Sequence, residues 1–377
     1  MPSSTRSPIS LSRHRRQTSS TISSNESRSP TSSFGSSTYR STTLETSNIS
    51  VEHEQMDDER WCRLAFALGM PYGEVRHHSP ESAKLVQRVR AQKHISSKGI
   101  TRLIAPLLLQ VSRKHGIINF GTNSAFHQDS VPHGLPGFEM EGSWRTKLPT
   151  PKPTFTFGYS SDAFTSHELE LQRGIIANSR NEPCDLDKLS QPVPDVFWPF
   201  LVLESHEGSM AAARNACADS AAACNNAPMV FAAAVQQPAK RYHDLDFLWG
   251  LSKAAQSFSL AINGKTACLN THNSEGCLPH GMATIRTYRL DDERDVEAMA
   301  ARIRSILIWA ENCRLQSILD LLQGFDKRVE LAKDSVMVTQ EVYVPPQLEM
   351  RSQPSRKRRG VIRNVIVDSL PRWAREF

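Results

Sequence analysis

Residues 196–204, VFWPFLVLE, form the most apolar run in the sequence. Unbroken apolarity of this kind is typical of a strand that is buried on both faces of a sheet. Pro199 lies within the run and predicts a bulge or a sheet edge at that point. An alanine-rich segment, residues 209–227, follows almost at once. Because alanine favours helix and packs closely, the strand–turn–helix order predicts an α/β fold.

Helix signals dominate the chain between residues 57 and 116. Residues 57–69 have the pattern of a short helix. Ser79, Pro80 and Glu81 supply an N-cap, a proline at the first helical position and an early acid, which together start a second helix. Residues 98–116 predict an apolar third helix with a kink near Pro106 and a C-cap at Gly116.

Strand signals follow in the second half of the chain. Residues 154–157 alternate polar and aromatic side chains, residues 257–272 form two alternating runs around Asn263-Gly264, and residues 282–292 continue the pattern. Asn-Gly is a strong hairpin signal. Residues 292–325 then have helical spacing of apolar side chains. We therefore expect a small mixed central sheet flanked by helices.

The two ends of the chain differ from this middle part. The first 50 residues include 26 Ser or Thr, a composition that predicts disorder because it buries little apolar surface. We expect a disordered tail over residues 1–55, a helical part over 56–118, a core over 119–345 and a basic tail over 346–377. Whether 56–118 is a separate domain stays open.

Several general properties limit where the protein works. The N-terminus has no apolar signal-peptide region, and the sequence has no run of about 18 apolar residues. Seven cysteines without a CxxC pair favour reduced thiols. These features predict a protein that is not secreted, has no membrane span, and is nuclear or cytoplasmic.

Four blocks, in this order, resemble the fungal branch of the PD-(D/E)XK nuclease-like proteins. The blocks are PKPTFTFGYS, WPFLVLESHEGSMAAARNACADSAAA, FSLAINGKTACLNTH, and YRLDD followed by the helix that holds ILIWAENCR. The resemblance implies a restriction-endonuclease-like fold. It also implies a Pro-Asp on one strand and a Glu-x-Lys on its neighbour, with carboxylates holding Mg²⁺ for phosphodiester hydrolysis.

Residue by residue, the resemblance implies an altered site. Glu204 fills the Glu position, Ser205 follows with a backbone carbonyl that could bind metal, and His206 stands where Lys is expected. Asp195 opens the same strand that Glu204 closes, about 30 Å away if that strand is continuous. Thr154 is therefore the better match for the Asp position. Asp162, in the loop beyond, is the candidate for a migrated acid and a third metal ligand, and Glu207 could assist.

Other polar residues have more than one interpretation. Arg214 and Asn215, at the start of the alanine-rich helix, either contact phosphate or solvate the outer face of that helix. His272 either faces the same site or is simply a polar residue at the end of a strand. The basic cluster Arg356, Lys357, Arg358 and Arg359 fits a nuclear-import signal, a phosphate-binding arm or a solvated linker.

Three functions follow from this pattern. The first is a nuclease-like protein with impaired catalysis that binds DNA or RNA. The second is an active nuclease that needs Mg²⁺ and has a rearranged site. The third is a protein-interaction scaffold. Whether the chain is an enzyme and what its oligomeric state is are not decided by the sequence.

Overall fold

The apolar run of residues 196–204 lies inside a seven-stranded mixed sheet. Its strand, β6 (Phe197–Ser205), runs antiparallel to β3 (Phe155–Tyr159) and parallel to β7 (Ser257–Asn263). The computed structural model describes residues 34–36, 38–71, 79–132, 148–178, 182–207, 209–235, 245–273 and 280–341. These ranges all belong to one compact unit, Ser32–Phe377.

The strand order in this sheet is β1-β9-β8-β7-β6-β3-β2. The remaining strands are β1 (Ile49–Gln55), β2 (Ile118–Thr122), β8 (Thr266–Asn273) and β9 (His280–Arg289). The pairs β1–β9 and β6–β7 are parallel and the others are antiparallel. The predicted α/β class with a mixed central sheet is therefore confirmed, although the sheet is larger than expected.

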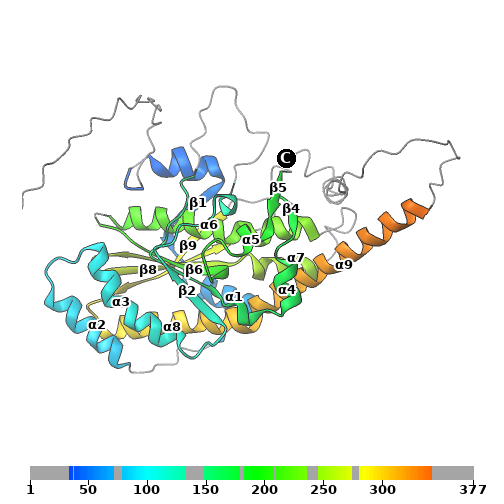
Figure 1. The fold of residues 1–377 in the computed structure, drawn as a ribbon. Helices are drawn as coiled ribbons and strands as arrows, with labels where there is room; N and C mark the ends of the chain where they lie inside the picture. Colours follow the sequence, from blue (N-terminus) through cyan, green and yellow to red (C-terminus); the bar gives the residue numbers. More distant parts are fainter. Residues whose placement is uncertain are drawn as a thin grey trace, which may run out of the picture. The chain divides into compact units, whose positions relative to one another are not determined.

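Helices flank the sheet on both faces (Figure 1). The alanine-rich helix α6 (Met210–Val235) covers one face, while α3 (Ser97–Ser112) and α8 (Glu293–Trp309) cover the other. The other α-helices are α1 (Asp58–Leu68), α2 (Pro80–Ala91), α4 (Ser166–Leu171), α5 (Leu186–Ser190), α7 (Leu245–Ala254) and α9 (Leu315–Glu341). Short helical turns are η1 (Arg40–Leu44), η2 (Glu45–Ser47), η3 (Gln128–Ser130), η4 (Ser161–Ala163) and η5 (Ala310–Arg314), and β4 (Ile175–Ala177) pairs with β5 (Pro183–Asp185).

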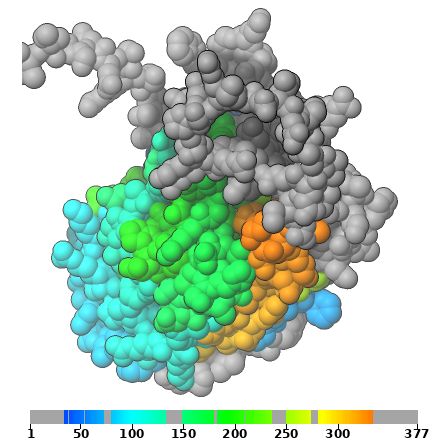
Figure 2. Space-filling view, turned by 45° about the vertical axis from the view of Figure 1, so that its right-hand side comes forward, coloured from blue at the N-terminus to red at the C-terminus, as the bar shows by residue number. Residues whose placement is uncertain are grey.

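Helix α9 packs against α4 at the surface seen in Figure 2, where its orange surface lies beside the green one. His167 Nε2 on α4 lies 3.3 Å from Asp326 Oδ2 on α9. This contact and the apolar cluster beneath it join the last long helix to the sheet domain.

The helix signals of the sequence are confirmed in position, with one exception. Asp57 caps α1, and Ser79 and Pro80 begin α2 as expected. Helix α3 passes through Pro106 but ends at Ser112, so the predicted C-cap at Gly116 is wrong. All three helices lie in the same compact unit as the sheet. Residues 56–118 therefore do not form a separate domain.

The predicted boundary of a disordered tail at residue 55 is wrong. Residues 40–47 form η1 and η2, and β1 pairs with β9 at the edge of the sheet. Tyr39, Leu44 and Ile49 are the buried anchors of this segment. These three large apolar residues are enough to hold the segment against the sheet, because an edge strand also forms backbone hydrogen bonds with its neighbour. Amino-acid composition does not reveal those bonds. Residues 1–33 lie outside the described part of the chain.

Strand β6 has the bulge that Pro199 predicted, and it is an inner strand. Phe157 pairs with Leu201 and Tyr159 with Phe197, so β6 has extra residues at Trp198 and Pro199. Trp198 has φ 46°, an uncommon value for a large side chain. The bulge is supported from η5, where the buried Arg314 donates to the carbonyls of both residues, at 2.8 and 3.2 Å.

Candidate functional site

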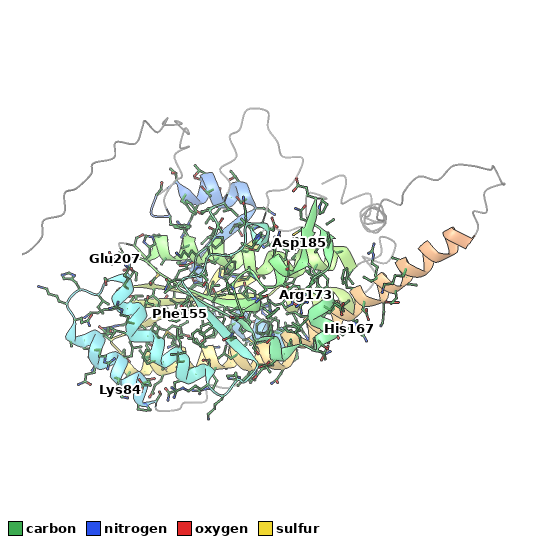
Figure 3. The ribbon with its side chains drawn as sticks, in the orientation of Figure 1. Lys84, Phe155, His167, Arg173, Asp185 and Glu207 are labelled. Carbon is green, nitrogen blue, oxygen red and sulfur yellow. The ribbon has the colours of Figure 1, made fainter. Side chains whose placement is uncertain are left out.

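The two faces of the central sheet differ in chemistry. The face toward α3 and α8 is apolar and includes Phe155, Leu203 and Leu260, and Figure 3 shows Phe155 in the middle of the sheet. Polar side chains fill the contact between the other face of the sheet and α6, and among the described residues all of them except Asp219 have a hydrogen-bond partner there. We call this set the polar layer; its members are Glu204, Asp219, Ser220, Ser259, Asn270 and His272.

Thr154 lies beside Glu204, as the sequence predicted. Phe155 pairs with Leu203 in the antiparallel register, and the Thr154 amide donates to the Leu203 carbonyl at 2.9 Å. The next positions along the two strands are therefore Thr154 and Glu204. The two segments that the resemblance places side by side thus meet, with a threonine where the resemblance implies an aspartate.

Asp162 and Glu204 are not brought together. Strand β3 runs from Phe155, beside Leu203, to Tyr159, beside Phe197. Asp162 follows Tyr159 in η4, so it lies beyond the opposite end of β6 from Glu204. The proposal that Asp162 is a migrated acid or a metal ligand with Glu204 is wrong, because an antiparallel strand carries the chain away from that site.

Asp195 also lies at the far end of β6. It precedes Phe197 with φ 59°, and its carbonyl accepts a hydrogen bond of 2.7 Å from Asn119 Nδ2 on β2. This position agrees with the interpretation of Pro194-Asp195 as the start of a strand rather than as a metal-binding dipeptide.

The residues after Glu204 turn toward α3. Ser205 Oγ lies 3.0 Å from Thr101 Oγ1 and donates to the Ser97 carbonyl. Glu207 accepts a hydrogen bond of 3.0 Å from the Ser97 amide, which caps the beginning of α3, and Figure 3 shows it at that end of the helix. Glu207 therefore has a structural partner and does not assist at Glu204.

His206 follows the end of β6 and is partly exposed. Its Nδ1 lies 2.9 Å from the Glu207 carbonyl, and its amide donates to Ile262 of β7. Within the described ranges, no hydrogen bond or ion pair joins the ring to Glu204. The ring is therefore not held against the acid in the way that a base or a water-orienting group would be.

Glu204 is held against α6 by one hydrogen bond. Ser220 Oγ donates to Glu204 Oε1 at 2.7 Å. Burial raises the pKa of Glu204 to about 7, while the bonds from Ser220 and from the Thr154 backbone limit the rise. Glu204 therefore holds its proton to a higher pH than an ordinary glutamate, which weakens the carboxylate as a ligand for a hard cation.

Asp219 is a second acid beside Glu204, and sequence reasoning missed it. It is fully buried, and neither of its carboxylate oxygens has a hydrogen-bond partner in the described part of the chain. Burial, followed by the negative charge of Glu204, raises the pKa of Asp219 well above its ordinary range. An acid within an otherwise small and apolar helix, ACADSAAAC, was the available signal.

His272 belongs to the polar layer and is not open to solvent. It is the second-to-last residue of β8, and its Nε2 lies 2.8 Å from Ser259 Oγ on β7. Burial lowers its pKa to about 3, with smaller contributions from the charges of His280 and Arg214. The ring is neutral at physiological pH and is a buried polar residue at a strand end.

Arg214 and Asn215 do not solvate the outer face of α6. Arg214 Nη2 donates to the Glu52 carbonyl on β1 at 2.6 Å. Asn215 is buried; its amide donates to the Phe34 carbonyl at 2.9 Å and accepts from Arg40 Nε at 2.8 Å. The outer-face interpretation of both residues is wrong, because Arg214 connects α6 to β1 and Asn215 connects α6 to the segment before β1.

The metal site that the resemblance implies does not assemble from the expected residues. Glu204 and the Ser205 backbone lie at one end of β6 and Asp162 lies beyond the other. Within the ranges that the structure describes, no group of three His, Cys, Asp or Glu side chains is arranged to hold a metal ion. These residues do not fit an Mg²⁺ ion. The basic cluster at residues 356–359 lies outside the described ranges.

One family model matches residues 85–322, and its description is a domain of unknown function, DUF7924. The chain belongs to the DUF7924 family. The DUF7924 match begins within α2, ends within α9 and includes the whole polar layer. It leaves out η1 and β1, which precede it. No curated protein matches the chain. Over the described residues, no helix is long and apolar enough to cross a membrane.

Proposed function

We propose that this protein is a nuclease-like DNA- or RNA-binding protein whose catalytic site is impaired. The observation that carries the proposal is the pair Thr154 and Glu204 on neighbouring strands. The motif positions meet as the resemblance implies, but a hydroxyl replaces one acid. The remaining acid has a pKa of about 7.

The chemistry of the polar layer supports impaired catalysis. Hydrolysis of a phosphodiester at a metal site needs ionised ligands that face the substrate. Glu204 instead accepts a hydrogen bond from Ser220, and Asp219, on α6, is fully buried. Any cation bound here would first have to displace protons from both acids, so its affinity would fall steeply below neutral pH.

Positive charge supports the binding role. The net charge is +6, and the cluster Arg356, Lys357, Arg358 and Arg359 concentrates basic groups near the C-terminus. Binding to phosphates through such groups releases counterions, so the affinity falls steeply with salt. A nuclear role is consistent with this charge and is part of the proposal.

An active enzyme is the second candidate, and Asp219 is the observation that favours it. Its two unpartnered oxygens next to Glu204 provide a second acid that the resemblance does not assign. The purified protein should be incubated with plasmid and with single-stranded DNA in Mg²⁺ or Mn²⁺, beside the Glu204→Ala and Asp219→Asn variants. We expect the wild-type protein to cut no more than either variant. If the wild-type protein cuts and both substitutions abolish the cutting, the protein is an active nuclease and the proposal of impaired catalysis is wrong.

Binding is tested separately from cutting. We expect single- and double-stranded oligonucleotides to bind, with an affinity that falls at least tenfold between 50 and 200 mM salt. Replacing residues 356–359 by glutamine should weaken binding at every sequence tested. If neither DNA nor RNA binds at low salt, the interaction scaffold becomes the better explanation.

A further inference from the structure

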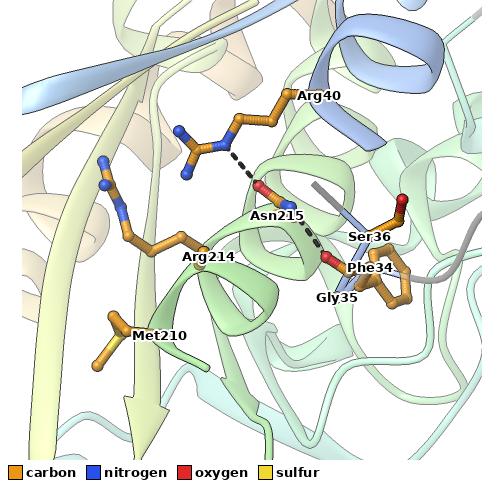
Figure 4. Close-up of a pocket in the computed structure, with 8 residues that line it drawn as sticks. Phe34, Gly35, Ser36, Arg40, Met210, Arg214 and Asn215 are labelled. Atoms are coloured by element: carbon orange, nitrogen blue, oxygen red, sulfur yellow. Dashed lines mark hydrogen bonds between the residues drawn. The ribbon is translucent and has the colours of Figure 1, made fainter. Parts of the chain in front are cut away.

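A pocket of about 640 Å³ lies at the beginning of α6, on the side of η1. Its lining residues are Phe34, Gly35, Ser36, Arg40, Met210, Ala211, Arg214 and Asn215. Figure 4 shows the two arginines above the start of the helix, with Asn215 bridging Arg40 and the Phe34 carbonyl. The described residues of this lining thus include two cations and no acid.

The geometry assigns this pocket to the phosphate group of a nucleotide, bound between Arg40 and Arg214. The choice of a nucleotide as the ligand rests on the proposed function. The experiment below measures phosphate binding directly and does not depend on that function. The phosphate is the shared chemistry of two sources, a free mononucleotide and the terminal phosphate of a nucleic-acid strand.

Arg214 brings positive charge to the pocket, and no carboxylate of the described residues pairs with it. One terminal nitrogen donates to the Glu52 carbonyl, and its buried Nε has no hydrogen-bond partner among the described residues. The carboxylate of Glu52 is taken by Arg60, in a bidentate pair of 2.6 and 2.7 Å. Arg214 forms no ion pair with a carboxylate in the described part of the chain.

Arg40 is positioned as the second cation by Asn215. The amide oxygen of Asn215 accepts from Arg40 Nε, and its amide nitrogen is tied to the Phe34 carbonyl. Burial, and then the charge of Arg214, lowers the pKa of Arg40, which reflects repulsion between the two guanidinium groups. A dianion between them would remove this repulsion and accept charge-assisted hydrogen bonds.

The start of α6 adds to the positive potential. Ser209 caps the helix through its Oγ, which accepts from the Ala212 amide at 3.1 Å. The helix has 26 residues, and its N-terminal turn faces the pocket through Met210 and Ala211. The partial positive charge of a helix N-terminus therefore acts in the same direction as the arginines.

The walls explain why a nucleotide fits better than a bare ion. The volume exceeds what one phosphate fills, and Phe34 and Met210 provide apolar surface beside the cations. Phe34 also packs on Tyr39, with ring centroids 5.0 Å apart, so the aromatic wall is supported from behind. An aromatic ring and a thioether can contact a base or a sugar.

The test uses the full-length protein and isothermal titration with inorganic phosphate, then with adenosine monophosphate. We expect the wild-type protein to bind both, with the mononucleotide at least fivefold tighter. Arg214→Gln and Arg40→Gln should each weaken binding at least tenfold. The matched control is Arg63→Gln, an exposed arginine on α1 that should leave both affinities unchanged.

The two sources of the phosphate are separated with one oligonucleotide, prepared with a 5′-phosphate or a 5′-hydroxyl end. If the wild-type protein prefers the phosphorylated end and Arg214→Gln removes this preference, the pocket binds the ends of strands. If both forms bind equally, the free mononucleotide is the ligand. Absence of phosphate and mononucleotide binding to the wild-type protein would overturn the inference. So would full affinity in both arginine variants, even if nucleic acid still bound elsewhere.

Discussion

Ser220 on α6 donates a hydrogen bond of 2.7 Å to Glu204 on β6. This bond crosses from the alanine-rich helix to the central sheet and ends on an acid whose pKa burial raises to about 7. The ionisation of Glu204 is therefore coupled to the stability of the helix–sheet contact.

The first prediction is that the free energy of unfolding falls as the pH rises from 5 to 8. A carboxyl whose folded pKa lies above its unfolded value of 4.5 holds its proton more tightly in the folded state. Its stabilising effect is fully present below pH 4.5 and is lost as the pH rises through 7. After allowance for partial exposure, Glu204 should contribute on the order of 1–3 kcal/mol.

Urea unfolding at several pH values measures this effect, and the Glu204→Gln variant isolates it. Glutamine keeps the shape and a hydrogen-bond acceptor but cannot ionise. The pH dependence of the variant should be smaller than that of the wild-type protein by the amount given above. Equal slopes in the two proteins would show that Glu204 ionises normally.

The second prediction concerns the hydroxyl that faces Glu204. Ser220→Ala removes a hydrogen bond that lowers the pKa of this acid, so we expect the pKa to rise above 7. At pH 8 the variant should lose about 1–2 kcal/mol of stability, because a buried ionised group loses a partner.

Carbon-13 NMR of labelled glutamate carboxyls follows the pKa of Glu204 directly. Ser305→Ala is the control, since the Ser305 hydroxyl on α8 donates to the Ala301 carbonyl within its own helix. An unchanged titration of Glu204 in Ser220→Ala would contradict the contact.

The third prediction is that Arg314→Met destabilises the protein by about 3 kcal/mol. The guanidinium supplies hydrogen bonds to the carbonyls of Trp198 and Pro199, and the variant leaves both carbonyls buried without a donor. Thermal and urea unfolding measure the loss. Arg63→Met, at an exposed position, should stay within about 0.5 kcal/mol of the wild-type protein; a similar loss in both variants would refute this role of Arg314.

The fourth prediction concerns the close approach at Gly158. A Cβ at this position would lie 2.5 Å from the Phe197 carbonyl oxygen and 2.7 Å from Val196 Cγ1. Gly158→Ala should therefore destabilise the protein by about 1–3 kcal/mol. Gly116→Ala is the matched control because nothing lies within 4 Å of its Cβ position. If Gly158→Ala leaves the free energy of unfolding unchanged, β3 and the bulge can move apart without loss of stability.

The placement of Thr154 beside Glu204 was predicted from the resemblance to the PD-(D/E)XK nuclease-like proteins, and the strand register agrees with it. The strand that ends at Glu204 and the bulge at Pro199 followed from local sequence rules. The prediction for Asp162 failed because sequence proximity to Tyr159 does not reveal the direction in which β3 leaves the site.

Other features depended on long-range contacts that no local pattern encodes. No strand was predicted at β2, and β1 lies in the segment that was predicted to be disordered. Arg214 was read from its position in a helix, whereas its side-chain direction is set by the Glu52 carbonyl on an unpredicted strand. Asp219 was missed because the alanines around it in the sequence drew attention to helix packing rather than to a buried acid.

The pairing of β1 with β9 has a consequence for biosynthesis. Ile49 lies opposite His280, so about 230 residues must leave the ribosome before this strand meets its partner. Until then its backbone amides and carbonyls are without their final partners and are open to chaperones or to the same strand of another nascent copy. The wall that holds Arg40 over α6 is therefore among the last parts of the domain to form.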